Sequence, residues 1–216
     1  MVRGAFITIE GCEGTGKSTQ AALLADALRA AELRVVEARE PGGTPLGEAV
    51  RRILLDRDHD GLEPRAELLL YEAARAELTA RVIAPALASG AAVVCDRHID
   101  STTAYQGHGR GLPLGEIGRL NRFATAGLLP DVTIVLDLDV AEGLRRATGV
   151  AGADRLEAED IAFHERVREG FLRTAADDPK RVVVVSAEGL PETVAERVLA
   201  AVRTVPVLDV VLGRRP

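Results

Sequence analysis

The sequence predicts one α/β domain of three layers, in which helices cover both faces of a five-stranded parallel sheet. Short apolar runs alternate with longer segments whose apolar residues recur every three or four positions. The runs are typical of buried strands and the longer segments of helices, and their alternation indicates a parallel sheet enclosed by helices. A length of 216 residues fits a single domain, assigned here to residues 1–216.

Five apolar runs form the expected strands, which are residues 5–10, 33–38, 91–95, 132–137 and 181–185. A Pro-Gly-Gly turn at residues 41–43 follows the second strand, and the charged pair Asp96 and Arg97 follows the third. Ligands of open parallel sheets bind at the carboxyl ends of the strands. We therefore expect both segments to lie near a ligand.

The intervals between the strands contain the expected helices, which cover residues 17–31, 44–56, 64–88 and 191–202, with further helical segments between the third and fifth strands. In the first helix, Ala21, Leu24, Ala25 and Leu28 recur at helical spacing. Pro85 predicts a kink in the third helix because proline lacks a backbone N–H. Pro191 begins the last helix, a position that suits proline.

Composition excludes several classes of protein. The net charge of −6 argues against general nucleic-acid binding, which needs a basic face, but allows a small phosphorylated ligand. Cys12 and Cys95 lie far apart and form no CxxC motif, which suggests a reducing, cytoplasmic setting with both residues buried. We see no signal peptide at the N-terminus and no run approaching the ~20 apolar residues of a membrane span.

Lysine occurs only at positions 17 and 180, against 25 arginines, so the lysine within GKST is conspicuous. Residues 11–19 (GCEGTGKST) have the Gly-x4-Gly-Lys-Ser pattern of a P-loop, between an expected strand and an expected helix. Such a loop wraps its backbone N–H groups around phosphate oxygens at a helix N-terminus. Lys17 then reaches the β- and γ-phosphates, and the Ser18 hydroxyl suits Mg²⁺. The expected ATP-binding residues are Gly11, Cys12, Glu13, Gly14, Thr15, Gly16, Lys17, Ser18 and Thr19.

The P-loop alone establishes only a nucleoside triphosphate site. A GTPase would need an Asn-Lys-x-Asp motif, which is absent from the sequence. A motor ATPase would usually have a strand that ends in adjacent acids, and the candidates here are Asp96 and Asp137. Since Arg97 follows Asp96, this pair suits a second phosphate better, with Asp96 holding Mg²⁺ through water.

Five motifs in this order resemble those of bacterial thymidylate kinases, and the resemblance covers nearly the whole chain. The motifs are residues 10–19 (EGCEGTGKST), 39–44 (REPGGT), 96–98 (DRH), 101–107 (STTAYQG) and 154–160 (DRLEAED). The resemblance implies the P-loop nucleoside monophosphate kinase fold with a small lid. It implies direct transfer of the γ-phosphoryl group of ATP to dTMP with Mg²⁺, giving ADP and dTDP for dTTP biosynthesis. It also implies a homodimer.

The resemblance further assigns the residues that bind the acceptor. Arg51 contacts the monophosphate with Arg97, near the segment that contains Glu40. Tyr71 stacks on thymine, and Arg75, four residues later on the same helix face, hydrogen-bonds a thymine carbonyl. The polar groups Thr102 and Gln106 read the pyrimidine edge.

Two further acceptor-site roles follow from the resemblance. Tyr105 packs beside the sugar and discourages a 2′-hydroxyl. Glu13, an unexpected acid beside phosphates, helps to position the 3′-hydroxyl of the acceptor or its solvation.

Small, uncharged residues at 148–153 (TGVAGA) predict a lid of about residues 146–159. In some thymidylate kinases the catalytic arginine occupies the P-loop position held here by Gly14. This chain resembles the type that places it in the lid, where Arg155 fits, supported by Arg145 and Arg146. One of those two alternatively stacks on adenine. The expected catalytic residues are thus Lys17, Arg97, Arg155 and Glu13.

Two rival functions remain open at this point. One is a kinase for another mononucleotide or for a nucleoside. The other, from a different class, is a P-loop binding or regulatory module with weak ATPase activity.

Overall fold

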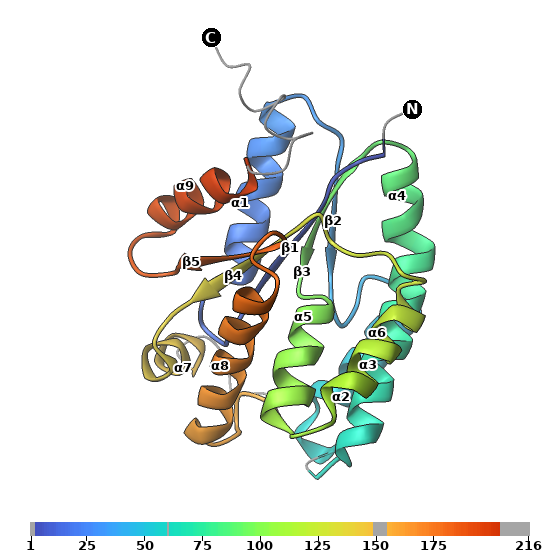
Figure 1. Ribbon diagram of the computed structural model, residues 1–216, viewed down its shortest axis with the longest axis vertical. Coiled ribbons are helices and arrows are strands. Elements are labelled where there is room, and N and C mark those ends of the chain that lie inside the picture. Colours follow the sequence, from blue (N-terminus) through green and yellow to red (C-terminus); the bar gives the residue numbers. More distant parts are fainter. Residues whose placement is uncertain (1–2, 60, 149–154, 204–216) are drawn as a thin grey trace.

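The computed structural model describes residues 3–59, 61–148 and 155–203, and it confirms the predicted sheet (Figure 1). All strand pairs are parallel, and the strand order is β2-β3-β1-β4-β5. The strands are β1 (Phe6–Gly11), β2 (Val35–Arg39), β3 (Ala92–Asp96), β4 (Val132–Asp137) and β5 (Val182–Ser186). Each lies within two residues of its predicted start and one of its predicted end, because each apolar run is bounded by polar residues or turns.

The α-helices are α1 (Lys17–Ala30), α2 (Pro45–Leu55), α3 (Pro64–Leu78), α4 (Ala84–Ala88), α5 (Ile99–Thr102), α6 (Leu114–Ala124), α7 (Val140–Thr148), α8 (Ile161–Asp177) and α9 (Pro191–Val202). Thr44 caps α2, accepting a hydrogen bond from the Gly47 amide at 3.0 Å, so the helix begins one residue later than predicted. A short 3₁₀ turn covers Arg57–His59.

Two helical segments widen into π-helix, which the sequence pattern did not predict. Thr79–Ile83 joins α3 to α4, so the predicted helix 64–88 is continuous but irregular just before Pro85. The second, Thr103–Gly109, continues α5. Such widened turns recur at functional sites, and this one carries Tyr105 and Gln106.

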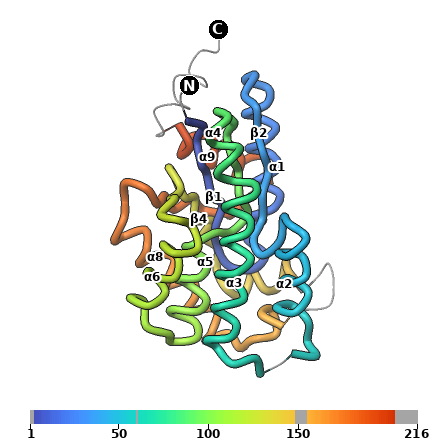
Figure 2. The backbone as a smooth tube through the Cα atoms, turned by 90° about the vertical axis from the view of Figure 1, so that its right-hand side faces the viewer, coloured from blue at the N-terminus to red at the C-terminus, as the bar shows by residue number. Residues whose placement is uncertain are grey.

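Helices cover both faces of the sheet, as predicted (Figures 1 and 2). On one face, α1 and α9 pack against a core that includes Ile7, Ile9 and Ile134. On the other face, the segment from α3 to α4, the π-helix after α5 and α8 bury side chains such as Phe6 and Phe171. Phe6 and Ile7 enter opposite layers because successive strand residues point to opposite faces.

Both cysteines are buried and unpaired, as predicted. None of the helices within the described residues is long and apolar enough to cross a membrane.

The carboxyl ends of β1 and β3 lie side by side and position the candidate site. Ile9 pairs with Asp96, and the Arg97 amide donates to the Ile9 carbonyl at 3.0 Å. The loop after β1 therefore meets the residues that follow β3. Of the predicted lid, residues 149–154 lie outside the described part of the chain.

Candidate active site

The loop between β1 and α1 adopts a conformation that requires glycine at position 14. Gly14 has φ +67°, and an added Cβ would lie 1.9 Å from the carbonyl oxygen of Gly143 in α7. A side chain at this position cannot be accommodated without moving α7. An arginine therefore cannot occupy position 14 of this P-loop, and the assignment of the catalytic arginine to the lid stays a prediction.

The Cys12 carbonyl organises this loop. It accepts hydrogen bonds from the Thr15 hydroxyl at 2.9 Å and from Lys17 Nζ at 2.5 Å. Burial lowers the pKa of Lys17, and the nearby Arg97 lowers it further. Because α1 begins at Lys17, its first N–H groups have no helical acceptors and are oriented to receive an anion.

Ser18 and Asp96 meet at the end of the sheet, as the two predicted metal ligands should. The Ser18 hydroxyl donates to Asp96 Oδ2 at 2.5 Å. Asp96 Oδ1 is buried and lacks a hydrogen-bond partner within the described residues. A hydroxyl and a carboxylate with a vacant oxygen fit Mg²⁺, which takes few protein ligands alongside phosphate oxygens and water. The alternative acid, Asp137, is held instead by two hydrogen bonds from Arg168 at 2.7 and 2.9 Å.

Arg97 is directed into the site by an unusual backbone conformation. Its φ of +68° lies in the left-handed region, which is costly for a residue other than glycine and is found at functional sites. The guanidinium donates to Glu13 at 2.8 Å and to the Gly11 carbonyl and the Ser101 hydroxyl, both at 3.3 Å. It also lies over the ring of Tyr105, 4.9 Å from the ring centroid.

A buried carboxylate fixes the chain that follows Arg97. Glu10 accepts hydrogen bonds from the His98 amide at 2.7 Å and from the Ser101 hydroxyl at 2.5 Å. Burial, with the nearby charge of Asp100, raises the pKa of Glu10 to about 8. His98 is itself fully buried, with its ring packed edge-on against Phe6 and its Nδ1 2.8 Å from Glu40.

Glu13 is the only acidic residue of the loop, and three side chains surround its carboxylate. It pairs with Arg97, accepts from the Tyr105 hydroxyl at 2.7 Å and lies 3.5 Å from His164 Nδ1. Burial by itself raises the pKa of a carboxyl. Arg97, the nearby His164 ring and Lys17 outweigh this effect and hold the pKa of Glu13 well below its usual value. Glu13 is therefore ionised and oriented beside the place where phosphate would bind.

One cavity of about 260 Å³ joins these groups to the second predicted site. The predicted site residues in its wall are Glu13, Gly14, Lys17, Ser18, Glu40, Arg51, Tyr71, Asp96, Arg97, Thr102, Tyr105 and Gln106. The remaining predicted residues, which lie outside this wall, are Gly11, Cys12, Thr15, Gly16, Thr19, Arg75, Arg145, Arg146 and Arg155.

The wall opposite the P-loop combines a positive charge with polar groups. Arg51 donates to the Pro41 carbonyl at 3.0 Å and forms no ion pair with a carboxylate of the described residues. A partly buried arginine without an acidic partner is suited to an anionic ligand. Near it, Thr102 Oγ1 is buried without a hydrogen-bond partner in the part of the chain that the structure describes.

Arg75 lies behind this wall and not in it. All five of its N–H donors have partners: Nε bonds Glu40, Nη1 bonds Glu72 and Asn121, and Nη2 contacts Glu40 and the His98 carbonyl, at distances of 2.7 to 3.1 Å. The predicted contact with a thymine carbonyl would therefore replace an existing bond. The arrangement shown supports Glu40 from behind, because Arg75 and His98 hold its two oxygens.

Arg155, the predicted catalytic arginine of the lid, is also engaged elsewhere. Its Nε donates to the Leu54 carbonyl at 2.8 Å, and its Nη2 lies 2.5 Å from Glu67 Oε2. With an exposed fraction of 4%, it contacts α2 and α3 and does not line the cavity.

The two arginines of α7 lie on the other side of the P-loop. Arg145 and Arg146 both pair with Glu142, at 2.9 and 2.7 Å. Arg146 also contacts the Ala187 carbonyl at 3.4 Å, in the loop that follows β5. The structure thus separates these arginines: Arg155 lies against α2 and α3, whereas Arg146 lies beside the loop that follows β5.

Several residues that the structure brings to the site were given no individual role from the sequence. In the cavity wall these are Arg39, Pro41, Ser101, Leu156 and Glu157, which belong to predicted motifs, and Leu55, which does not. His164 reaches Glu13 from α8, and its only signal in the sequence is a polar residue on the apolar face that contains Val167 and Phe171.

Comparisons with known proteins agree with this geometry. A family model described as thymidylate kinase matches residues 9–198. The thymidylate kinases of Solidesulfovibrio magneticus and Gloeobacter violaceus are 52% and 55% identical to this chain over 204 and 199 residues, 91% of this chain in both cases, and 98% and 93% of their own lengths. The crystal structure of thymidylate kinase from Ehrlichia chaffeensis superimposes with a TM-score of 0.78 at 35% identity, covering 93% of this chain and 99% of that one.

Proposed function

The chain belongs to the thymidylate kinase family, and we propose that its cavity carries out the transfer of the γ-phosphoryl group of ATP to dTMP, giving ADP and dTDP. One observation supports this most directly. A single cavity is lined by the P-loop residues Lys17 and Ser18, by Arg51 and by Arg97, which contacts the P-loop at Gly11 and Glu13. Two phosphates can therefore be held facing each other, as direct in-line transfer requires.

ATP binds along Gly11–Thr19 with its γ-phosphate toward Arg97. Lys17 leaves the Cys12 carbonyl and donates to the β- and γ-phosphates. Ser18 and Asp96, the latter through water, would hold Mg²⁺, which neutralises charge on the transferred group. Arg146, beside the β5 loop, lines the adenine side together with Arg145.

The acceptor occupies the opposite wall. Arg51 and Arg97 hold the monophosphate through parallel N–H groups. Tyr71 stacks on the base, and the unpaired Thr102 hydroxyl faces its polar edge with Gln106. Arg75 reaches a thymine carbonyl only by exchanging one of its bonds.

The sugar lies against Tyr105 and Glu13, which are hydrogen-bonded to each other. Tyr105 is buried against the P-loop acid, so its ring restricts the space on this side of the cavity. Glu13, kept ionised by Arg97, orients the 3′-hydroxyl or its solvation. No general base is needed, since a phosphate acceptor is already ionised.

Arg155 acts as the catalytic arginine after it leaves Glu67 and turns toward the transferred group. Closure of the lid around residues 146–159 excludes water from the reaction. The predicted lid thus supplies a cation that the P-loop cannot hold at position 14.

The proposed function is tested by ADP release from ATP with each nucleoside monophosphate in turn. We expect dTMP to accelerate release at least about 100-fold over ATP alone, because the acceptor completes the site, and we expect chelation of Mg²⁺ with EDTA to abolish it. A larger effect of another monophosphate or a nucleoside would support the first rival. No acceleration by any acceptor would support the regulatory module.

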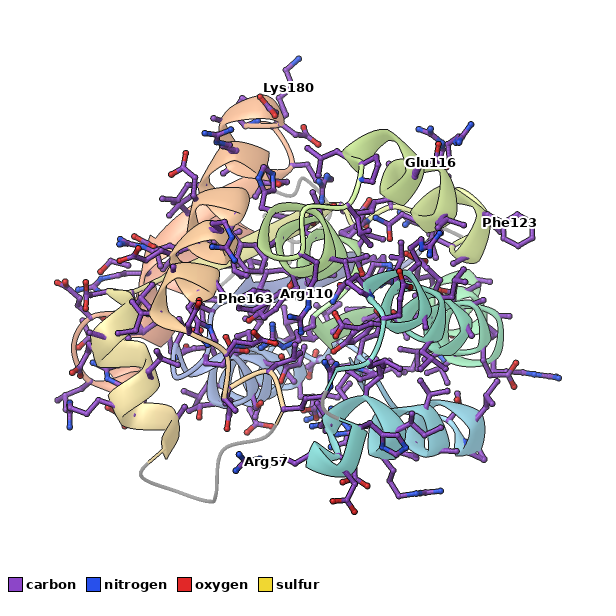
Figure 3. All side chains as sticks on the ribbon, turned by 90° about the horizontal axis from the view of Figure 1, so that it is seen from below. Arg57, Arg110, Glu116, Phe123, Phe163 and Lys180 are labelled. Atoms are coloured by element: carbon purple, nitrogen blue, oxygen red, sulfur yellow. The ribbon has the colours of Figure 1, made fainter. Side chains whose placement is uncertain are left out.

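We also propose that the protein is a homodimer that pairs through α6 and the adjoining part of α3. Phe123 on α6 is 87% exposed and projects from the surface (Figure 3). Leu69 on α3 and Leu129, which follows α6, are about half exposed. Exposed apolar side chains of this size favour a protein contact.

Replacing Phe123 by glutamate is expected to convert the dimer to a monomer, because a charge in an apolar interface loses its hydration without gaining a partner. Size-exclusion chromatography with light scattering measures the mass. Leu190→Glu is the matched control, since Leu190 is 70% exposed but precedes α9 on the other side of the sheet. A monomeric wild type, or a dimer in the Phe123→Glu variant, would contradict this interface.

We also propose that the protein is located in the cytoplasm. The two buried, unpaired cysteines agree with a reducing compartment, and the proposed substrates are metabolites of the cytoplasm.

A further inference from the structure

Glu67, in the first turn of α3, is a fully buried carboxylate to which the mechanism above gives no chemical role. Donors from three segments converge on it. Gln106 Nε2 donates at 2.8 Å, Arg110 Nη2 at 3.2 Å, and Arg155 Nη2 lies at 2.5 Å. Burial by itself raises the pKa of this carboxyl, but the Gln106 hydrogen bond and the two arginines lower it below its usual value. Glu67 is therefore an ionised group that can only accept hydrogen bonds.

This property fixes the orientation of the Gln106 side chain. A carboxamide has a donor end, the nitrogen, and an acceptor end, the oxygen. Because an ionised carboxylate only accepts, the Gln106 nitrogen must face Glu67. The oxygen is then the end left for a ligand, and it accepts no hydrogen bond from the described residues. Gln106 lines the cavity, whereas Glu67 does not.

The two ends of the amide distinguish pyrimidines. Thymine and uracil carry a hydrogen on N3, so this edge donates a hydrogen bond. Cytosine has a lone pair on N3, so the same edge accepts. An amide that presents its oxygen pairs with thymine or uracil and leaves cytosine with two facing acceptors. An amide that presents its nitrogen to the base would instead prefer cytosine.

We infer that Glu67 is a positioning residue that sets the base specificity of the acceptor site, by holding Gln106 with its oxygen toward the pyrimidine. This inference rests on the proposed function, since it needs a pyrimidine beside Gln106. It extends that function by naming a residue that never touches the substrate. Glu67 sets the preference for a base with N3–H over cytosine, and leaves thymine and uracil undistinguished.

Glu67 also has a structural role, because it pairs with Arg110 and Arg155. Arg110 lies over the ring of Phe163, 4.8 Å from its centroid, and also pairs with Glu159 at 2.6 Å (Figure 3). These contacts secure α3 against the end of the π-helical segment and the base of the lid. These contacts affect the stability of the fold and the position of the lid, but they do not affect the choice of base.

Glu67→Gln is the decisive variant because it keeps the shape and removes the charge. The arginines compete for the one remaining oxygen, which leaves the new amide nitrogen facing Gln106. Gln106 then turns its oxygen toward position 67 and its nitrogen toward the base. We expect the ratio of kcat/KM for dTMP to that for dCMP to fall about 10- to 100-fold. The values for dTMP and dUMP should fall together, since both bases carry N3–H.

Arg110→Met is the matched control, because it removes another partner of Glu67 and leaves Gln106 in place. Its stability is expected to fall, but its dTMP to dCMP ratio should equal that of the wild type. A double-mutant cycle with Gln106→Leu supplies the second test. In the Gln106→Leu background, Glu67→Gln should not change the ratio any further.

The inference is overturned if Glu67→Gln binds nucleotides normally and keeps the wild-type ratio, or if Arg110→Met lowers the ratio equally. It is also overturned if Glu67→Gln still lowers the ratio in the Gln106→Leu background. Should Glu67→Gln not fold, Glu67→Asp withdraws the carboxylate by one methylene and is expected to lower the ratio in the same direction. A wild-type enzyme that does not use dTMP would instead refute the proposed function, so the two failures are distinguishable.

Discussion

Replacing Lys17 by alanine is expected to abolish turnover, with kcat lowered about 10³-fold or more. In the proposed mechanism Lys17 is the cation of the P-loop, and it contacts the transferred phosphate as negative charge spreads over it. Loss of one positioned donor at such a site costs about 10²- to 10³-fold, and loss of a full charge costs more. Steady-state ADP release with saturating ATP and dTMP measures the effect.

The chain offers an unusually clean control for this experiment. Lys180 is the only other lysine in the sequence, and it projects from the turn before β5 (Figure 3). Lys180→Ala removes the same charge from an exposed site and should leave kcat within about twofold of the wild type. If Lys17→Ala retained more than a tenth of the wild-type kcat, Lys17 would not have the role proposed for it.

Local patterns in the sequence were sufficient for the sheet and for the phosphate loop. A strand that is buried on both faces consists of consecutive apolar residues, so its first and last residues can be identified in the sequence. The P-loop and the pair Ser18 and Asp96 follow from motifs at the ends of neighbouring strands. Parallel strands end at one edge of the sheet, and this geometry alone brings the two residues within hydrogen-bond distance.

The partners of the buried arginines could not be predicted in this way. Arg75 and Arg155 were assigned to the ligands, but their partners Glu40 and Glu67 lie far from them in sequence and meet them only through tertiary packing against α3. An arginine that binds a ligand and one that pairs with an acid have the same sequence signal. The π-helical segment with Tyr105 and Gln106 is likewise invisible to a pattern based on 3.6 residues per turn.

Replacing Arg97 by alanine is expected to lower kcat/KM for dTMP about 10³-fold while leaving the affinity for ATP within about threefold. In the proposed mechanism Arg97 contacts the acceptor phosphate, and its planar guanidinium can donate to that phosphate from two nitrogens in parallel. Arg97→Lys keeps the charge but loses this planar geometry, so KM for dTMP should still rise at least about 10-fold. Arg173→Ala, at an exposed ion pair on α8, is the control.

Arg97→Ala is also expected to lower the free energy of unfolding. This loss of stability depends on pH, which distinguishes it from the loss of dTMP binding. Arg97 helps to hold the pKa of Glu13 below its unfolded value of about 4.3. A lowered pKa stabilises the fold above that value, and the stabilisation is lost as the pH falls through the folded pKa. Removing Arg97 should therefore cost up to about 3 kcal/mol near pH 7, and less below about pH 4. Urea unfolding at the two pH values measures the difference.

A double variant distinguishes a ligand-binding role of Arg97 from a structural one. Glu13→Gln removes the buried charge that Arg97 neutralises, so Arg97→Ala combined with Glu13→Gln should recover most of the lost stability at pH 7. It should not recover use of dTMP, because the acceptor phosphate still lacks its donor. If the stabilised double variant used dTMP normally, Arg97 would serve only to balance Glu13, and its assignment to the phosphate would be wrong.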